Sequence, residues 1–209
     1  MNKCKRNANY KENWENLPWC FDEIPQRFSD SIKSIKNSQK SDLWKALDIW
    51  CWVWNYSNFL QKNWFDVLWI DFSLEALKMA KEKYWEHDKL KFIEADALKY
   101  DLWENQFWLI CDISLFHHIF PNKRQTYISK IHKAVIKDWI FLLCCFNAED
   151  ERFNNKNIIE NNETGTIMYP LQEGEIGWYF KNLFKYKVKK IWFWKNNRKR
   201  FLIIMKPIK

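Results

Sequence analysis

Glycine is scarce in this chain, with 3 residues in 209. An average protein of this length has about 15, since glycine makes up about 7% of residues. Glycine adopts positive φ angles without strain, so its scarcity excludes a fold rich in glycine turns or glycine loops, if the sequence is taken as written. Tryptophan, normally a rare residue, occurs 15 times. The two residues look exchanged in number, and the positions of the tryptophans therefore need an explanation.

Long apolar runs are also missing. No stretch of 18 or more apolar residues occurs, which argues against a membrane-spanning helix. The basic start, Met1 to Arg6, is not followed by the apolar segment that a secretory signal needs. The six cysteines form no C-x-x-C pair, and no set of cysteines and histidines has the spacing of a zinc site. We expect a cytoplasmic protein with reduced, buried thiols and no metal.

The composition is otherwise that of a globular protein, with 47% hydrophobic and 29% charged residues. The net charge of +8 raises the question of nucleic-acid binding. However, the lysines are scattered, and the densest basic stretch, residues 185–200, reads as strands with solvated faces. We therefore expect neither a nucleic-acid nor a membrane partner.

Apolar periodicity predicts an alternation of strands and helices. Predicted strands cover 46–49, 65–70, 91–94, 107–111, 140–146, 186–193 and 200–206, and predicted helices cover 24–37, 56–62, 73–84, 123–136 and 173–184; a long loop fills 148–166. Apolar strands separated by helices indicate a parallel sheet covered on both faces. The last two strands are close in sequence, so we expect an antiparallel hairpin. The predicted fold is α/β, a Rossmann-like doubly wound seven-stranded sheet, mostly parallel with an antiparallel last strand.

The segments that follow the first four predicted strands are the candidate site, because ligands of such sheets bind at the carboxyl ends of the strands. They read, in chain order, Leu47-Asp48-Ile49-Trp50-Cys51-Trp52-Val53-Trp54, Trp69-Ile70-Asp71-Phe72-Ser73, Glu94-Ala95-Asp96-Ala97 and Asp112-Ile113-Ser114-Leu115-Phe116-His117-His118-Ile119.

These segments resemble the class I S-adenosylmethionine-dependent methyltransferases, with one systematic difference. The first loop of that family reads L-D-x-G-x-G-x-G, and here Trp50, Trp52 and Trp54 stand at the glycine positions. The family's second strand often ends G-x-D, here Trp69-Ile70-Asp71, and a glycine often precedes the fifth strand, here Trp139. The short length, the L-P-W at 17–19 and the F-H-H-I at 116–119 are most similar to small-molecule enzymes of the thiopurine or tellurite-resistance kind.

The resemblance covers nearly the whole chain and implies a single domain over residues 1–209. Residues 1–40 would be an N-terminal extension and helix, 41–147 the cofactor-binding half, and 148–209 the substrate-side loop, helix and closing strands. The cofactor would be S-adenosyl-L-methionine, the partner a small-molecule substrate, and the protein a monomer or weak dimer. The implied cofactor-binding residues are Asp48, Trp50, Cys51, Trp52, Trp54, Asp71, Phe72, Asp96, Ala97 and Asp112. The implied substrate-side residues are Trp19, Phe116 and His117, with His117 the candidate catalytic residue.

The tryptophans at glycine positions have a simple explanation in the genetic code. The codon TGA is read as tryptophan in some variant codes and as glycine in others, so a gene from a TGA-glycine lineage translated with the wrong table would show tryptophan for glycine. About 12 exchanged residues would restore a typical glycine content of about 7%. The physics points the same way, because the first loop must bring its backbone against the ligand, where indoles would fill the pocket.

Several alternatives remain open. A nicotinamide enzyme would need G-x-G-x-x-G, and the spacing here is two residues each time. An RNA or protein methyltransferase is the second candidate, and a non-catalytic Rossmann-like binding protein is the third if the tryptophans are genuine. Asp71 and Asp96 could instead be solvated loop carboxylates or helix caps. His117 could pack beside cofactor or substrate, or act as a general base, and the segment 148–170 could cover the acceptor site or be a plain loop.

Overall fold

The computed structural model describes residues 7–8, 24, 26–37, 44–49, 55–63, 65–153, 156–161, 165–193 and 198–209. Over these residues strands and helices alternate as the apolar pattern predicts. The first half contains α2 (Gln26–Asn37), β1 (Lys45–Ile49), α3 (Asn55–Lys62), β2 (Asp66–Asp71), α4 (Leu74–Tyr84), β3 (Leu90–Glu94) and β4 (Phe107–Ile113). The second half contains η2 (Phe116–His118), α5 (Pro121–Ala134), β5 (Val135–Phe146), η3 (Glu151–Phe153), β6 (Ile159–Asn161), β7 (Thr166–Met168), α6 (Glu173–Phe180), β8 (Phe184–Phe193) and β9 (Arg198–Pro207).

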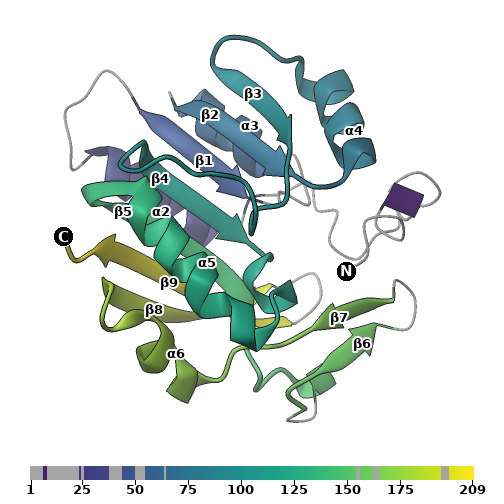
Figure 1. Ribbon diagram of the computed structural model, residues 1–209, viewed down its shortest axis with the longest axis vertical. Helices are drawn as coiled ribbons and strands as arrows, with labels where there is room; N and C mark the ends of the chain where they lie inside the picture. Colours follow the sequence, from purple (N-terminus) through teal and green to yellow (C-terminus); the bar gives the residue numbers. More distant parts are fainter. Residues whose placement is uncertain are drawn as a thin grey trace.

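Seven strands form one twisted sheet in the order β3-β2-β1-β4-β5-β9-β8. The pairs among β1 to β5 are all parallel, and β9 is antiparallel to both β5 and β8. The strand order reverses beside β1, so connecting helices cover both faces of the sheet, and Figure 1 shows α5 crossing in front of it. The predicted fold, a doubly wound seven-stranded sheet with an antiparallel last strand, is confirmed.

Local sequence signals explain where several helices begin. Ser73 is the N-cap of α4, and its Oγ accepts a hydrogen bond from the backbone N–H of Ala76 at 3.2 Å. Helix α5 begins at Pro121, two residues before the predicted start. Proline suits the first turn of a helix because it has no N–H to leave unpaired there.

The structure differs from the predicted elements at several places. Helix α6 ends at Phe180 rather than 184, and β8 begins at Phe184 rather than 186. Strand β5 begins at Val135 rather than Ile140, with a register shift opposite Phe107 and Leu109 and a positive φ of 67° at Asp138. The predicted loop over 148–166 contains the turn η3 and the first strand of a small hairpin, in which β6 pairs antiparallel with β7. Both strands of that hairpin are three residues long, too short for periodicity to reveal.

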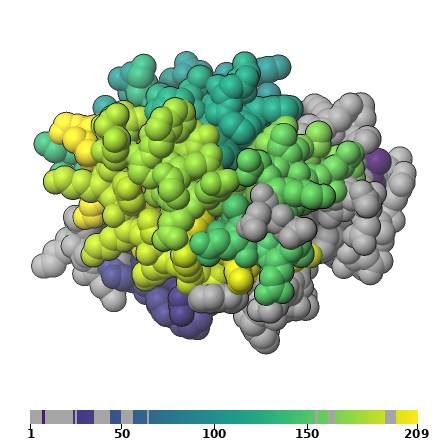
Figure 2. Space-filling model, turned by 90° about the horizontal axis from the view of Figure 1, so that it is seen from below, coloured from purple at the N-terminus to yellow at the C-terminus, as the bar shows by residue number. Residues whose placement is uncertain are grey.

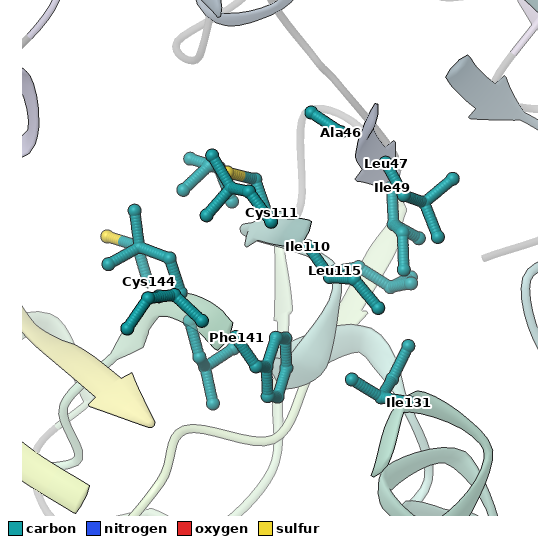
Figure 3. Packing of buried hydrophobic residues seen from close by; sticks show 14 of the residues in the cluster. Ala46, Leu47, Ile49, Ile110, Cys111, Leu115, Ile131, Phe141 and Cys144 are labelled. Carbon is teal, nitrogen blue, oxygen red and sulfur yellow. The ribbon is translucent and has the colours of Figure 1, made fainter. Parts of the chain in front are cut away.

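The core lies between the central strands and the helices on both faces. Figure 3 shows part of it, with buried side chains of β1, β4 and β5, which alternate between the two faces of the sheet, and one side chain of α5; they include Ala46, Leu47, Ile49, Ile110, Cys111, Ile131, Phe141 and Cys144. Cys111, Cys144 and Cys145 are buried free thiols, as predicted. Cys4, Cys20 and Cys51 lie outside the described residues.

Buried tryptophans are part of the same core. Trp44, Trp108 and Trp139 form a cluster in which the rings of Trp108 and Trp139 are 4.2 Å apart. Trp69 is fully buried in β2 and lies 5.0 Å from the ring of Phe92. Trp69, Trp108 and Trp139 therefore lie inside strands, and for Trp139 this differs from the expected position just before the fifth strand.

Three other tryptophans are exposed at the surface. Trp85 follows the last residue of α4, has a φ of 53° and is 78% exposed. Trp103 lies in the segment between β3 and β4, and Trp178 lies on α6; both are exposed. Trp64 and Trp194 lie outside the described residues. Among the helices that the structure describes, none is long and apolar enough to cross a membrane.

Candidate functional site

Three carboxylates lie on adjacent strands at the carboxyl edge of the sheet. Asp48 is the penultimate residue of β1, Asp71 ends β2 and Asp112 is near the end of β4. The register places Ile49 opposite both Ile70 and Asp112, so the three carboxylates are close to one level. Each of them is 0–1% exposed. Burying carboxylates costs free energy unless they are hydrogen-bonded, so the partners of each one are informative.

Asp48 is bound to the helix that follows its strand. The hydroxyl of Ser57 on α3 donates to Oδ2 of Asp48 at 2.5 Å. This bond links the end of β1 to the first turns of α3 across the intervening loop. Asp48 therefore fixes the end of β1 relative to the start of α3.

Asp71 and Ser73 shape the turn after β2. The backbone N–H of Ser73 donates to Oδ1 of Asp71 at 2.8 Å, and the backbone N–H of Ala95 donates to the carbonyl of Asp71 at 2.9 Å. The Ser73 hydroxyl also donates to Oδ1 of Asn7 at 2.7 Å, which brings the N-terminal part of the chain to this turn. The carboxylate is thus oriented by its own turn.

A cavity of about 490 Å³ opens beside this turn. Its lining comes from the segments after β2, β3 and β4 and includes Phe72, Glu94, Asp96, Ala97, Leu115, His118 and Phe120. The size is within the range of small-molecule sites, and the lining combines apolar and aromatic side chains with a few polar groups, as such sites do. The structure therefore brings together Phe72, Asp96 and Ala97, three of the residues predicted for the site.

The Asp96–Ala97 segment is held from both sides. Oδ1 of Asp96 accepts from the backbone N–H of Leu98 at 2.9 Å, which makes a tight turn. On the side of α5, the ammonium of Lys130 donates to the carbonyls of Leu98 at 2.7 Å and Tyr100 at 2.8 Å. The burial of Lys130 lowers the pKa of its ammonium. The segment is therefore fixed before any ligand arrives.

Asp112 has protein partners on both carboxylate oxygens. Oδ1 accepts from the backbone N–H groups of Leu115 and Phe116 at 2.8 and 3.2 Å, and the hydroxyl of Tyr127 donates to Oδ2 at 2.8 Å. Burial raises the pKa of Asp112 to about 7, against the opposing effect of these hydrogen bonds. Asp112 therefore fixes the turn at the end of β4, and through it the position of η2.

His117 is buried beneath that turn, where its ring stacks 4.2 Å from the ring of Phe146. The backbone N–H of Phe146 donates to Nδ1 of His117 at 3.3 Å, so Nδ1 carries no proton. Burial is the main reason that the pKa of His117 lies well below its usual value, and the nearby charges of His118 and Arg200 lower this pKa further. The ring is therefore neutral, with its proton on Nε2.

The neighbouring side chains point to different environments. Phe116 is fully buried against α5 and α6, with its ring 5.8 Å from that of Tyr179. His118 lines the cavity, and its Nδ1 lies 3.0 Å from the carbonyl of Ile167 on β7, to which it can only donate. Of the pair His117-His118, the second residue is thus the one on the cavity wall.

Several residues of this region were not predicted. Arg200 on β9 donates from Nη1 to Oγ of Ser114 at 2.6 Å, and its guanidinium lies 4.3 Å from the Phe146 ring. Arg124 on α5 is buried and donates to the backbone carbonyl of Tyr169. These contacts join residues 45 to 86 positions apart, so no local pattern could have revealed them. The one local signal was Arg124, which shares the buried face of the predicted helix with apolar residues.

Five predicted site residues lie outside the described residues: Trp19, Trp50, Cys51, Trp52 and Trp54. The expectation that indole rings would occupy the cofactor position concerns these residues and stays a prediction. Among the residues that the structure describes, no group of three or more histidine, cysteine, aspartate or glutamate side chains could hold a metal ion.

A protein-family model matches the central part of the chain. Residues 46–138 match the family model described as a methyltransferase domain. No curated protein matches the chain in sequence.

Solved structures share the fold. The chain is similar to a Burkholderia thailandensis 1,6-didemethyltoxoflavin-N1-methyltransferase with bound 1,6-didemethyltoxoflavin and S-adenosylhomocysteine (TM-score 0.71, 15% identity, 99% of this chain and 87% of that chain). It is also similar to the N-methyltransferase NodS from Bradyrhizobium japonicum, in complex with S-adenosylhomocysteine (0.66, 13%, 100% and 100%). A third similar structure is a TehB-like S-adenosylmethionine-dependent methyltransferase from Corynebacterium glutamicum (0.62, 14%, 97% and 98%). At these identities the likeness shows the fold.

Proposed function

We propose that this protein is an S-adenosylmethionine-dependent methyltransferase and that its acceptor is a small molecule. The match of residues 46–138 to a methyltransferase-domain model and the strand order of the sheet support the reaction. The observation that carries the proposal is the cavity of about 490 Å³ after β2, β3 and β4. The solved structures of similar fold include one with a small heteroaromatic molecule bound. We treat residues 1–209 as one domain and the protein as a monomer or weak dimer.

The described residues fit an adenosine moiety. The cavity offers an aromatic ring at Phe72, an exposed carboxylate at Asp96 and the apolar Ala97 and Leu115. Asp71, at the end of β2, is suited to accept hydrogen bonds from the two ribose hydroxyls. Asp96 accepts from the adenine amino group. Asp48 and Asp112 stand on the side of the methionine moiety, together with the loop of Trp50, Cys51, Trp52 and Trp54.

When bound, S-adenosylmethionine supplies a methyl group that its positive sulfonium already activates for in-line attack. The protein therefore needs mainly to align acceptor and donor and to exclude water. The turn after β4, held by Asp112, would line this end of the cofactor. No strongly basic side chain is needed for such a transfer if the acceptor is already nucleophilic.

On the acceptor side we place Phe116, His117 and Trp19. His117 is the candidate catalytic residue, and its geometry favours positioning over proton abstraction. Its Nδ1 already accepts a hydrogen bond from Phe146, so the neutral ring has only an Nε2–H to offer to a ligand. A general-base role would require Nδ1 to give up that bond.

We further propose that about 12 of the tryptophans stand at positions where the fold calls for glycine, given a glycine content of about 7% in average proteins. Trp85 supports this, because its φ of 53° after α4 is a conformation that glycine adopts without strain. Trp69 and Trp139 bear on it in the opposite sense, because both indoles are accommodated within the core. The codons for Trp50, Trp52, Trp54, Trp69 and Trp139 decide the matter: TGA supports the exchange, and TGG contradicts it.

The test of the function is methyl transfer from labelled S-adenosylmethionine to a panel of heteroaromatic, thiol and inorganic small molecules, with RNA and protein fractions as separate arms. Label in a small molecule, lost on Asp71→Ala, is the expected result. Label confined to RNA or protein would replace the acceptor class. Cofactor binding with no transfer to any arm would favour a binding protein instead.

A further inference from the structure

A second hollow lies at the amino edge of the same sheet, away from the cavity just described. It has a volume of about 660 Å³ and runs between α2 and the strands β8 and β9. Its apolar floor is formed by Trp139, Ile140 and Ile204, and Ser31 and Ser34 of α2 form one wall. Figure 2 views this side of the molecule, where purple-blue atoms of the N-terminal part adjoin the yellow-green C-terminal segment.

The opposite wall is a row of four lysines: Lys185, Lys187, Lys189 and Lys206. All four are exposed, and none of them forms a salt bridge with a described residue, whereas the neighbouring Lys190 pairs with Glu149 and Glu173. Two acids, Asp30 and Asp138, also line the hollow, and Asp30 already accepts a hydrogen bond from Gln26. The lining keeps a net positive charge.

The lysines are regularly spaced because three of them occupy alternate positions of one strand. Lys185, Lys187 and Lys189 alternate along β8 and so point to one face, about 7 Å apart. Lys206 on β9 is paired directly with Lys185 and extends the row across the strands. Equally spaced ammonium groups along one wall suit a ligand whose negative charges also repeat along a line.

We propose that this hollow, the lysine groove, binds the phosphate backbone of single-stranded RNA. The lysines bind phosphates along the strand. A flat membrane surface fits less well, because the lysines face into a groove. An acidic peptide would need a carboxylate at every second residue of an extended segment to match the row, whereas every nucleotide of a single strand carries a phosphate.

Lysines on an edge strand also serve to prevent pairing with another sheet. That role accounts for β8, which is an edge strand, but not for Lys206 on the inner strand β9. The groove and the cofactor cavity lie at opposite ends of the strands. A ligand in the groove is therefore a separate binding event and does not depend on the proposed acceptor.

The experiment compares two triple variants of the full chain. Lys185→Gln/Lys187→Gln/Lys189→Gln removes three charges from the groove, and Lys78→Gln/Lys81→Gln/Lys91→Gln removes three exposed lysine charges from α4 and β3, at the opposite end of the sheet. Circular dichroism checks that both are folded. Binding of an oligouridylate of about 12 nucleotides, and of inorganic polyphosphate, is measured by fluorescence anisotropy or competition at several salt concentrations.

The groove triple should bind at least about tenfold more weakly, and the slope of log affinity against log salt should fall by about 2, because each phosphate contact on a single strand contributes about 0.7. The control triple should keep the original slope. Binding of oligouridylate with little competition by inorganic polyphosphate supports RNA as the ligand, and tighter binding of polyphosphate would contradict it. Equal losses in both triples, or tighter binding of polyglutamate than of either phosphate ligand, would overturn the proposal.

Discussion

The two edges of the sheet carry opposite charges, and they carry them in different ways. At the carboxyl edge Asp48, Asp71 and Asp112 are buried, and each has a hydrogen bond from the turn or helix that follows its strand. At the amino edge the lysines of the groove are exposed and make no salt bridge with a described residue. Burying a carboxylate costs free energy unless the carboxylate is hydrogen-bonded, and each of these three has such a bond. The exposed lysines remain hydrated, so their placement costs little free energy.

The contrast also separates two ways of binding. A buried, oriented carboxylate can select a ligand through short directed hydrogen bonds, and its loss is felt as a specific defect. An exposed row of ammonium groups attracts any matching line of negative charge, and its contribution falls with salt. Changes at the carboxyl edge should therefore have the larger effects.

The largest expected effect is at the loop after β1. Trp50→Gly/Trp52→Gly/Trp54→Gly should tighten S-adenosylmethionine binding by at least about 100-fold, about 2.7 kcal/mol. The reason is that the backbone of this loop must approach the ligand closely, and glycine has no side chain to prevent it. Isothermal titration calorimetry measures it. The alanine triple is the matched control and should recover less. Tight binding by the unaltered chain would contradict the steric argument.

A second large effect is expected at Asp112, in stability rather than binding. The pKa is about 7 in the folded protein against 3.8 for the free side chain, so the native state holds this proton more tightly than the unfolded chain. The stability it contributes is complete below about pH 4 and is lost as the pH rises toward 7, by about 1.4 kcal/mol per pH unit. Asp112→Asn keeps the oxygen that accepts from Leu115 and Phe116, turns an N–H donor toward the Tyr127 hydroxyl oxygen, which can accept it, and should remove this slope. Urea unfolding at several pH values tests it, and parallel profiles of the two proteins would contradict it.

Asp71→Asn, made in the glycine triple, should weaken S-adenosylmethionine binding by about 10- to 100-fold, the loss expected when a charged hydrogen-bond acceptor becomes neutral. The amide oxygen can still accept from the Ser73 N–H, so the turn should persist. Asp66→Asn, at the other end of β2, is the control and should leave the affinity unchanged. Unchanged affinity in Asp71→Asn would remove this residue from the ribose-binding role.

The smallest effect is expected at the amino edge, at the end of α4. Trp85→Gly should raise the free energy of unfolding by about 1 kcal/mol, because it relieves a side chain held at positive φ. Trp85→Ala keeps the Cβ and should bring no such gain. Equal stability of the two variants in thermal unfolding would show that the backbone there is unstrained.

The elements of the sheet were predictable because their sequences repeat a simple pattern. Buried parallel strands read as apolar runs, and helices such as α5 show apolar residues at every third or fourth position. The hairpin of β6 and β7 was missed because three-residue strands leave no period to detect. The early start of β5 was missed because exposed Lys137 and Asp138 interrupt its apolar run.

The candidate site was predictable to the extent that it follows strand ends. Phe72, Asp96 and Ala97 were predicted from their place after β2 and β3, and the cavity brings them together. The hydrogen bond from Tyr127 to Asp112, and that from Arg200 to Ser114, join distant parts of the chain. Such contacts depend on which elements become neighbours in the sheet, and a single sequence does not state that.

The bonds from Lys130 to the carbonyls of Leu98 and Tyr100 tie the floor of the cavity to α5. The backbone of that segment cannot open without first releasing the ammonium, and the two elements therefore share one local opening event. A ligand that rests on Asp96 and Ala97 should slow amide hydrogen exchange in the middle of α5 as well, although it touches no atom of that helix there.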